Sequence, residues 1–211
     1  MLENTLLAIL VIIASYLIGS IPFGYLVGRI GRGIDIRDYG SRNIGFTNVL
    51  RVIGPTPAVM TIVGDVLKGV GAVLLARFLQ LDAFVVVGAG LAAIAGHNWS
   101  LYLKFRGGRG VATTAGVVIA LTWQIGVALV LAWVFIVAVT RYVSIASITV
   151  VAIYPLLVIY FRKPLPIVIF GLVGAVVVIW RHKENIGRLV RGKEHKLGQR
   201  VDKDDRLKTE D

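Results

Sequence analysis

The chain has 211 residues, of which 56% are hydrophobic, and its mean hydropathy is +0.79. Soluble domains contain only about 45–50% apolar residues, so this composition excludes an ordinary soluble domain and indicates an integral membrane protein. The formal net charge is +11, but the basic residues stand between apolar runs, where anionic lipid and topogenic bias explain them, and we expect no nucleic-acid partner. The absence of cysteine excludes disulfides and thiolate metal ligands.

Apolar runs along the chain predict a bundle of membrane-spanning helices. The first run carries Glu3 and has no Lys or Arg before Arg29, so we expect it to be retained rather than cleaved as a signal peptide. A helix needs about 20 apolar residues to cross a bilayer, and the runs that fit are 5–28, 55–79, 83–103, 143–161 and 165–180. The run 111–139 is long for one helix and is interrupted at 122–124, which favours two short spans. We therefore predict an all-α integral membrane protein with about seven transmembrane helices; five spans with one re-entrant run are the alternative.

The basic residues are distributed unevenly between the two sides of the predicted bundle. If the N-terminus is outside, only Arg77, Arg162 and Lys163 fall outside, whereas the other Lys and Arg, including ten between positions 181 and 208, fall inside. The positive-inside rule thus predicts a multi-pass protein of the cell (inner) membrane with a cytoplasmic C-terminus. In this interpretation residues 1–194 form one membrane domain, and residues 195–211 form a charged, disordered cytoplasmic tail.

The first inside loop, residues 40–51, carries an unusual polar cluster. A solvated basic connector would need arginine but has no use for two Asn, a Ser and a Thr at fixed spacing among glycines, so we favour a functional loop over a plain connector. The residues concerned are Ser41, Asn43, Thr47, Asn48 and Arg51.

A second inside loop is rich in glycine and follows the run 83–103. It contains Gly107, Gly108, Arg109 and Gly110 directly before the apolar run that begins at Val111. Glycines let backbone N–H groups converge on one anion, Arg109 adds a fixed charge, and the following helix would present its N-terminus to the same point. The sequence therefore predicts a phosphate site at a membrane face.

Polar residues elsewhere are candidates for the same site or for its support. Asp65 and Lys68 lie one helical turn apart inside an apolar run, where they should face the bundle interior and form an ion pair. The hydroxyl of Ser144 stands in a short hinge, where a helix cap is as plausible as a functional role. His182 and Asn185 follow the last span and are spaced to share a helix face.

Taken together, these motifs resemble the bacterial acyl-phosphate:glycerol-3-phosphate acyltransferases, which are integral membrane enzymes of phospholipid synthesis. The likeness extends over nearly the whole chain, and five motifs occur in the expected order. They are Gly19-Ser20-Ile21-Pro22-Phe23-Gly24 with the Gly-Ser-x-Asn-Ile-Gly-x-Thr-Asn loop at 40–48, Asp65-x-x-Lys68-Gly69, Gly96-His97-Asn98 with Gly107-Gly108-x-Gly110, Tyr142-x-Ser144, and His182-x-x-Asn185-Ile186.

This resemblance implies a seven-helix fold, an active site at the cytoplasmic face, and transfer of an acyl group from acyl-phosphate to the 1-hydroxyl of glycerol 3-phosphate. It implies an acyl chain held among membrane lipid. We expect no cofactor, and no metal because the apolar spans offer no carboxylate cluster. A soluble enzyme that makes acyl-phosphate is a candidate partner for the basic surface. The resemblance assigns catalysis to Ser41, Arg109, His182 and Asn185; acyl-phosphate binding to Gly107, Gly108, Arg109, Gly110 and Ser144; glycerol 3-phosphate binding to Ser41, Asn43, Thr47, Asn48, Arg51, His182 and Asn185; and a supporting role to Asp65, Lys68, His97 and Asn98.

Three positions depart from the family pattern, and one role stays open. This chain has Arg42, Phe46 and Arg109 at positions where the family usually has Gly, Ala and Lys, respectively. The base that accepts the hydroxyl proton is either His182 or a phosphate oxygen of the substrate. We favour a His182 that grips the acceptor's phosphate, because flanking basic residues favour anion binding.

Other classes of protein fit the sequence less well. The His-x4-Asp signature of soluble-type glycerol phosphate acyltransferases is absent, and the apolar spans lack the acidic cluster that metal-dependent lipid phosphotransferases need. A transporter or channel for a phosphorylated solute is the main alternative, although paired broken spans in two halves are not evident.

Overall fold

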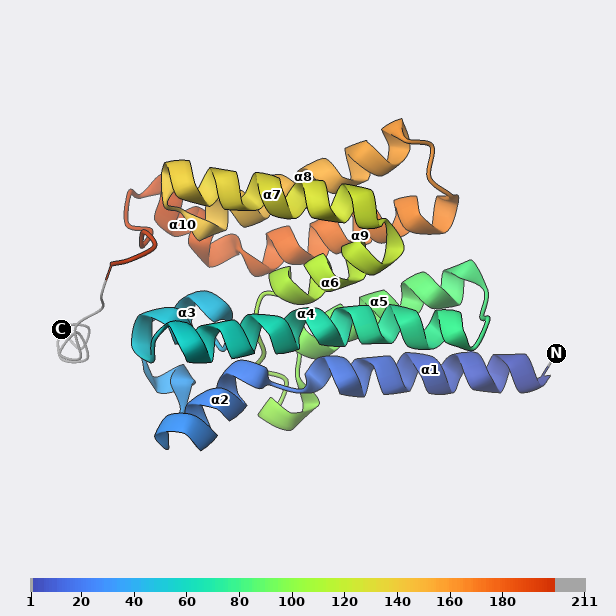
Figure 1. Ribbon diagram of the computed structural model, residues 1–211, viewed down its shortest axis with the longest axis horizontal. Helices are drawn as coiled ribbons and strands as arrows, with labels where there is room; N and C mark the ends of the chain where they lie inside the picture. Colours follow the sequence, from blue (N-terminus) through green and yellow to red (C-terminus); the bar gives the residue numbers. More distant parts are fainter. Residues whose placement is uncertain (1, 200–211) are drawn as a thin grey trace.

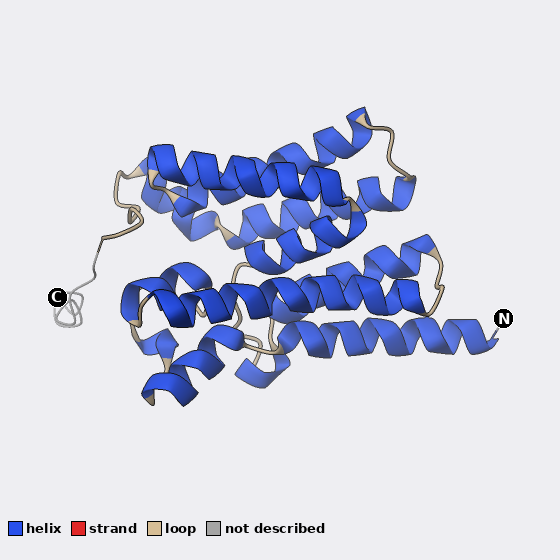
Figure 2. Cartoon of the chain, in the orientation of Figure 1, coloured by secondary structure: helices blue, strands red, loops and turns tan. Residues whose placement is uncertain are grey.

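The computed structural model describes residues 2–199, and within this part of the chain the regular secondary structure is all helical, without a strand (Figure 2). Two short 3-10 helices, η1 and η2, stand in loops. The helices, in chain order, are α1 (Leu2–Ser20), α2 (Phe23–Arg32), η1 (Ile36–Asp38), α3 (Phe46–Val52), α4 (Pro55–Phe78), α5 (Ala83–Asn98), η2 (Leu101–Leu103), α6 (Val111–Leu121), α7 (Trp123–Thr140), α8 (Val143–Tyr160), α9 (Leu165–Arg181) and α10 (Lys183–Val190).

Several helices have the length and composition of membrane spans. Five spans meet these criteria. Helices α1 and α2 together form one span, and α4, α5, α7 and α8 belong to one each. A sixth is formed if α9 and α10, which are bent by 57° relative to each other, are counted as one span. Helix α6 is apolar but has only 11 residues. Many large apolar side chains on the outer faces are exposed, among them Leu67, Phe135, Leu156 and Val176. The chain is therefore a multi-pass helical membrane protein, as the composition predicted.

The helices form two packed groups that meet at α6 (Figure 1). Helices α1, α4 and α5 pack together in one group, and α7, α8 and α9 in the other. Helix α6 contacts α4 on one side and α7 on the other. Val73, Val117, Val158 and Phe170 are fully buried between these elements, so the apolar core is continuous through the join.

The N-terminal run is broken where the sequence predicted one uninterrupted helix over 5–28. Helix α1 ends at Ser20, and α2 begins at Phe23 after Pro22. Proline has no N–H to donate to the preceding turn, so the helical ladder stops here. The carbonyl of Ile21 instead accepts a hydrogen bond of 3.0 Å from the Lys68 Nζ.

The predicted division of the run 111–139 is confirmed at Thr122. This residue separates α6 from α7 and has φ of −144° and ψ of 72°, outside the helical region. Its hydroxyl lies 3.1 Å from the Val118 carbonyl and 3.3 Å from the Tyr154 hydroxyl. The buried break is thus stabilised by polar contacts of its own.

Residues 191–199, called the C-terminal strap below, pack back onto the bundle after α10. Leu197 donates through its N–H to the Arg141 carbonyl at 2.7 Å and accepts from the Arg141 side chain at 2.9 Å. Lys196 stacks over the Tyr142 ring at 5.5 Å. Residues 195–199, expected to belong to a disordered tail, therefore lie against the α7–α8 hinge, and residues 200–211 fall outside the described part of the chain.

Candidate functional site

A cavity of about 420 Å³ joins the polar loops to an apolar groove. Its polar end is lined by Ser41, Arg51, Arg109, Ser144, His182 and Asn185, which come from five separate segments. Its apolar part runs between α6, α7, α8 and α9 and is lined by Ile119, Leu129, Trp133, Val150 and Phe170. The cavity can therefore accommodate an anionic head and an apolar chain in one continuous space.

His182 stands at the bend between α9 and α10 and is 2% exposed. Its Nδ1 lies 2.7 Å from the Val178 carbonyl oxygen. A carbonyl can only accept, so Nδ1 carries the proton and donates it. In the neutral ring Nε2 then has a free lone pair, which suits acceptance of a hydroxyl proton better than donation to a phosphate.

Asn185 and Arg188 on α10 share one acidic partner from the C-terminal strap. The Asn185 Nδ2 donates to Glu194 at 2.6 Å, and the Arg188 Nε donates to the other carboxylate oxygen at 2.7 Å. Burial raises the pKa of the Glu194 carboxyl, but these two hydrogen bonds outweigh it and hold the pKa below its usual range. Glu194 is therefore ionised at neutral pH and holds the two side chains at the cavity wall.

The first polar loop is organised around Asn48, which is 1% exposed. Its amide nitrogen donates to the carbonyls of Ile36, Tyr39 and Asn43 at 2.9–3.2 Å, and its Oδ1 accepts from the Ser41 N–H at 2.9 Å. Both N–H groups of the amide are thus used inside the loop. Asn48 therefore shapes the loop, and the substrate-binding role that the resemblance implies for it stays a prediction.

Asn43 and Arg51 complete this side of the cavity. The Asn43 Oδ1 caps the turn by accepting from the Gly45 N–H at 2.9 Å. Arg51 stands in the last turn of α3, with Thr47 one turn before it, and both line the cavity. Burial lowers the pKa of Arg51 from its ordinary value, yet no acidic group is salt-bridged to it within the described residues.

The glycine loop is packed tightly against the end of α5. A Cβ at Gly107 would overlap the His97 carbonyl, and one at Gly108 would overlap the His97 ring. The Gly108 N–H donates to the His97 carbonyl at 3.0 Å, so it is not available to a phosphate. Arg109 and Gly110 line the cavity, whereas Gly107 and Gly108 do not, so the donor-binding role of the first two glycines stays a prediction.

Helix α6 begins directly at the cavity. Gly110 is its N-cap and has φ of 82°, a left-handed conformation that favours glycine. The first N–H to be bonded within the helix is that of Thr114, which donates to the Gly110 carbonyl at 2.7 Å. The unpaired N–H groups of the first turn therefore face the same space as Arg109, the arrangement that anions prefer at a helix N-terminus.

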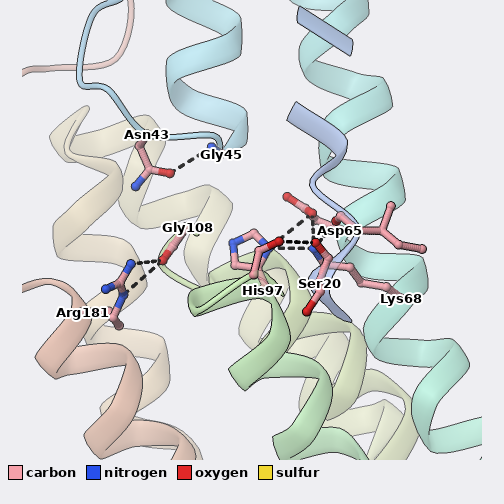
Figure 3. A network of polar contacts seen from close by, with 10 residues as sticks. Ser20, Asn43, Gly45, Asp65, Lys68, His97, Gly108 and Arg181 are labelled. Carbon is pink, nitrogen blue, oxygen red and sulfur yellow. Dashed lines mark hydrogen bonds and ion pairs between the residues drawn. The ribbon is translucent and has the colours of Figure 1, made fainter. Parts of the chain in front are cut away.

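Asp65, Lys68 and His97 form a buried polar cluster behind the loop (Figure 3). Lys68 Nζ lies 2.8 Å from the Asp65 carboxylate and 2.8 Å from the His97 Nδ1, and Asp65 lies 3.4 Å from the same nitrogen. The predicted Asp65–Lys68 pair is confirmed, with His97 as a third member. The cluster joins α4, the Pro22 break and the glycine loop.

Several buried polar atoms have no hydrogen-bond partner among the described residues. Among the cavity-lining side chains these atoms include the Thr114 Oγ1 and the Asn185 Oδ1, together with an Asp65 Oδ1 that is ion-paired with Lys68. Buried polar atoms are nearly always paired in proteins. Unpaired groups that converge on one space therefore mark it as a binding site. The amide of Asn98 is also unpaired but lies outside the cavity lining.

Charge at the polar end of the cavity is dominated by arginine. Burial lowers the pKa of Arg109 to about 10, and repulsion by Arg188 contributes in the same direction. Arg109 still carries its charge at neutral pH. The Glu194 carboxylate, 2.7 Å from the Arg188 Nε, offsets part of this positive charge. The positive charge that remains favours binding of an anion.

The structure brings together most of the residues that the sequence singled out. The cavity lining includes Ser41, Asn43, Thr47, Asn48, Arg51, Asp65, His97, Arg109, Gly110, Ser144, His182 and Asn185. Gly107, Gly108, Lys68 and Asn98 lie behind it. Arg181, Arg188 and Glu194 were not predicted as site residues. The position of Arg181 directly before His182 was the available signal for it. No sequence pattern indicated that Glu194 would contact Asn185 and Arg188.

Comparison with known proteins agrees with this geometry. Residues 9–192 match the profile of a family described as glycerol-3-phosphate acyltransferase. The chain is 48% identical over 189 residues to a glycerol-3-phosphate acyltransferase of Gloeobacter violaceus, covering 88% of this chain and 92% of the relative. It is 50% identical over 192 residues to glycerol-3-phosphate acyltransferase 2 of Moorella thermoacetica, covering 91% and 98%.

Solved structures show the same fold. The chain matches PlsY, an integral membrane glycerol 3-phosphate acyltransferase, in its glycerol 3-phosphate form with a TM-score of 0.86 and 38% identity, over 90% of this chain and 96% of that one. The lysophosphatidic acid form of the same enzyme gives a TM-score of 0.84 at 37% identity, over 90% and 94%. These likenesses favour an enzyme over the transporter alternative. The chain belongs to the glycerol-3-phosphate acyltransferase family of integral membrane enzymes.

Proposed function

We propose that this acyltransferase takes its acyl group from acyl-phosphate and transfers it to the 1-hydroxyl of glycerol 3-phosphate, releasing lysophosphatidic acid and inorganic phosphate. The observation that carries the proposal is the continuous cavity, whose basic end opens into an apolar groove. An acyl-phosphate has the matching form, with a compact anionic head and a long apolar chain. The unpaired N–H groups at the start of α6 and the Arg109 charge suit a phosphoryl group.

The reaction needs little covalent help from the protein. An acyl-phosphate is a mixed anhydride, so the glycerol oxygen attacks the acyl carbon, the ester C–O bond forms, and the C–O bond to phosphate breaks. The protein has to align the two substrates and stabilise the departing phosphate. In our proposal Arg109 and the α6 N-terminus receive that phosphate, while Ser41, Arg51 and Asn185 hold the acceptor.

The proton of the attacking hydroxyl passes to His182 in this scheme. Its Nδ1 is committed to Val178, so Nε2 accepts the proton and returns it to the leaving phosphate. This assignment replaces the phosphate-gripping role favoured by the sequence. The substrate's own phosphate oxygen is the competing base. The positive-inside distribution of the basic residues supports a site at the cytoplasmic face of the inner membrane.

The test is a donor comparison with purified protein. Acyl-phosphate plus glycerol 3-phosphate should yield one inorganic phosphate per lysophosphatidic acid formed, and acyl-CoA should support no comparable rate. The reaction should also persist after thorough chelation of divalent metals. Equal turnover with acyl-CoA would contradict the proposed donor while leaving the acyltransferase family intact.

A further inference from the structure

The last residue of α9, Arg181, lies against the back of the glycine loop (Figure 3). Its Nε and one terminal nitrogen donate to the Gly108 carbonyl at 3.1 and 2.7 Å, and the same terminal nitrogen lies 3.2 Å from the Gly107 carbonyl. The guanidinium also stacks over the Trp99 ring at 5.7 Å. One side chain therefore joins the end of α9, the end of α5 and the glycine loop.

We propose that Arg181 is a positioning residue that sets the glycine loop for the donor phosphate by holding the Gly107 and Gly108 carbonyls away from the cavity. Arg181 does not line the cavity, whereas Arg109 and Gly110 do. It therefore acts on a ligand through the loop. The inference rests on the proposed donor site at this loop.

The peptide geometry explains how the loop is set. In a trans peptide the C=O and the following N–H point in opposite directions. The peptide between Gly107 and Gly108 is held on both sides, by Arg181 at its carbonyl and by the His97 carbonyl at its N–H. The next carbonyl, of Gly108, also accepts from Arg181, so the Arg109 N–H points in the opposite direction, away from Arg181.

Without this contact the loop would have a second arrangement open to it. If one of these peptides rotated, the carbonyl oxygen of Gly107 or Gly108 would point toward the bound anion. That oxygen carries partial negative charge and would repel the anion. Glycine offers little resistance to such rotation because it has no Cβ. Hydrogen bonds to a charged guanidinium are about twice as strong as neutral ones, so Arg181 favours the productive arrangement strongly.

Arg181 also connects the two substrate sites. His182 follows it directly, so the same turn that holds the loop also places His182 at the cavity. Trp99 supports the arrangement, since its carbonyl accepts from the Tyr16 hydroxyl at 2.7 Å and its ring lies 6.1 Å from that of Trp180. A lysine at position 181 would keep the charge but could not span two carbonyls with a planar fork.

The experiment compares Arg181→Met and Arg181→Lys with Arg106→Met, an exposed residue of the same loop, as the matched control for charge. We expect Arg181→Met to raise the donor KM about tenfold, equivalent to about 1.4 kcal/mol, with the glycerol 3-phosphate KM within about twofold of wild type and with the lysine variant intermediate. Arg106→Met should leave both constants unchanged. A donor KM that is unaltered in a folded Arg181 variant, or an equal rise in both constants, would overturn the positioning role.

Hydrogen–deuterium exchange gives a second readout that does not depend on the donor. Amides of residues 104–112 should exchange faster in Arg181→Lys than in wild type, and those of α7 should not change. If acyl-phosphate fails as donor but the loop exchanges faster, the donor assignment is wrong and the positioning role of Arg181 is supported. Unchanged exchange of the loop in the lysine variant would contradict the positioning role of Arg181, even if the methionine variant did not fold.

Discussion

The imidazole Nδ1 of His182 lies 2.7 Å from the carbonyl oxygen of Val178, four residues earlier on α9. This contact fixes which nitrogen carries the proton, and leaves Nε2 as an acceptor in the neutral ring. The side chain is 2% exposed and lines the cavity between the two proposed substrate sites. The geometry therefore leaves a proton-accepting nitrogen on a side chain that lines the cavity.

The first prediction concerns this histidine. His182→Ala should lower kcat by about 10²–10⁴-fold, the usual range for loss of a general base, with a smaller effect on the glycerol 3-phosphate KM. His182→Gln keeps a hydrogen-bonding group but cannot shuttle a proton, so it should lose kcat to a similar extent. Steady-state kinetics of both variants provide the measurement. Substantial kcat in the glutamine variant would favour the substrate's own phosphate as the base.

The second prediction concerns Arg109 and high pH. Burial lowers the pKa of Arg109 to about 10, so its charge is complete at neutral pH and is lost as the pH rises through that value. The donor KM should therefore climb above about pH 10, with little change between pH 7 and 9. Arg109→Met should raise the donor KM about tenfold or more at neutral pH, because a charge-assisted hydrogen bond contributes about 1.5–3 kcal/mol. Arg109→Lys should retain most activity, and a lysine variant as impaired as the methionine variant would argue for a role in the fork geometry.

The third prediction concerns the C-terminal strap at low pH. Hydrogen bonds from Asn185 and Arg188 outweigh burial and keep the pKa of Glu194 below 4.5. A carboxyl whose pKa is lowered by folding stabilises the fold at pH values above its pKa in the unfolded state. That contribution is lost as the pH falls through its pKa in the folded state. Glu194→Gln should thus reduce thermal stability at pH 7, and its difference from wild type should shrink as the pH falls below 4.5 and through the folded pKa of Glu194. Thermal unfolding across this range tests it, and equal stability of the two proteins at pH 7 would contradict it.

The fourth prediction concerns Arg42, which has φ of 57° in the left-handed region that favours glycine. Its side chain is exposed and does not line the cavity. Left-handed backbone costs a non-glycine residue about 1–2 kcal/mol, and the added chain entropy of glycine returns roughly 0.5–1 kcal/mol of that. Arg42→Gly should therefore raise the melting temperature slightly and leave kcat unchanged. A lower melting temperature or a raised glycerol 3-phosphate KM would show that the Arg42 side chain has a role.

The fifth prediction concerns topology. Single cysteines at Asp82 and Lys163 should react with an impermeant reagent added to intact cells, and cysteines at Ser41, Arg106 and Lys183 should not. These inner positions lie on the segments around the cavity, and Gly108 is avoided because any side chain there would overlap the His97 ring. External labelling of Ser41, Arg106 or Lys183 would contradict a cytoplasmic site.

The sequence by itself was sufficient for the class of fold and for much of the site. Apolar runs and their spacing predicted a multi-span helical protein, and the break at Thr122 fell where α6 gives way to α7. The Asp65–Lys68 pair was predictable because two charges one turn apart in an apolar helix have few other partners. Polar residues in loops between apolar spans likewise indicated a site at one membrane face, since lipid offers them no hydrogen bonds.

Only the tertiary structure decided which of these residues line the cavity and which hold the surrounding loops in place. Asn48 looked like a ligand-binding amide, but its hydrogen bonds close the loop around it. Gly107 and Gly108 looked like a phosphate cradle, but close packing on His97 explains them, and Arg181 holds their carbonyls. Glu194 reaches Asn185 and Arg188 because the strap folds back. Local patterns specify helices through periodicity, whereas contacts between distant segments depend on how those helices pack, and a single sequence carries no periodic signal for that.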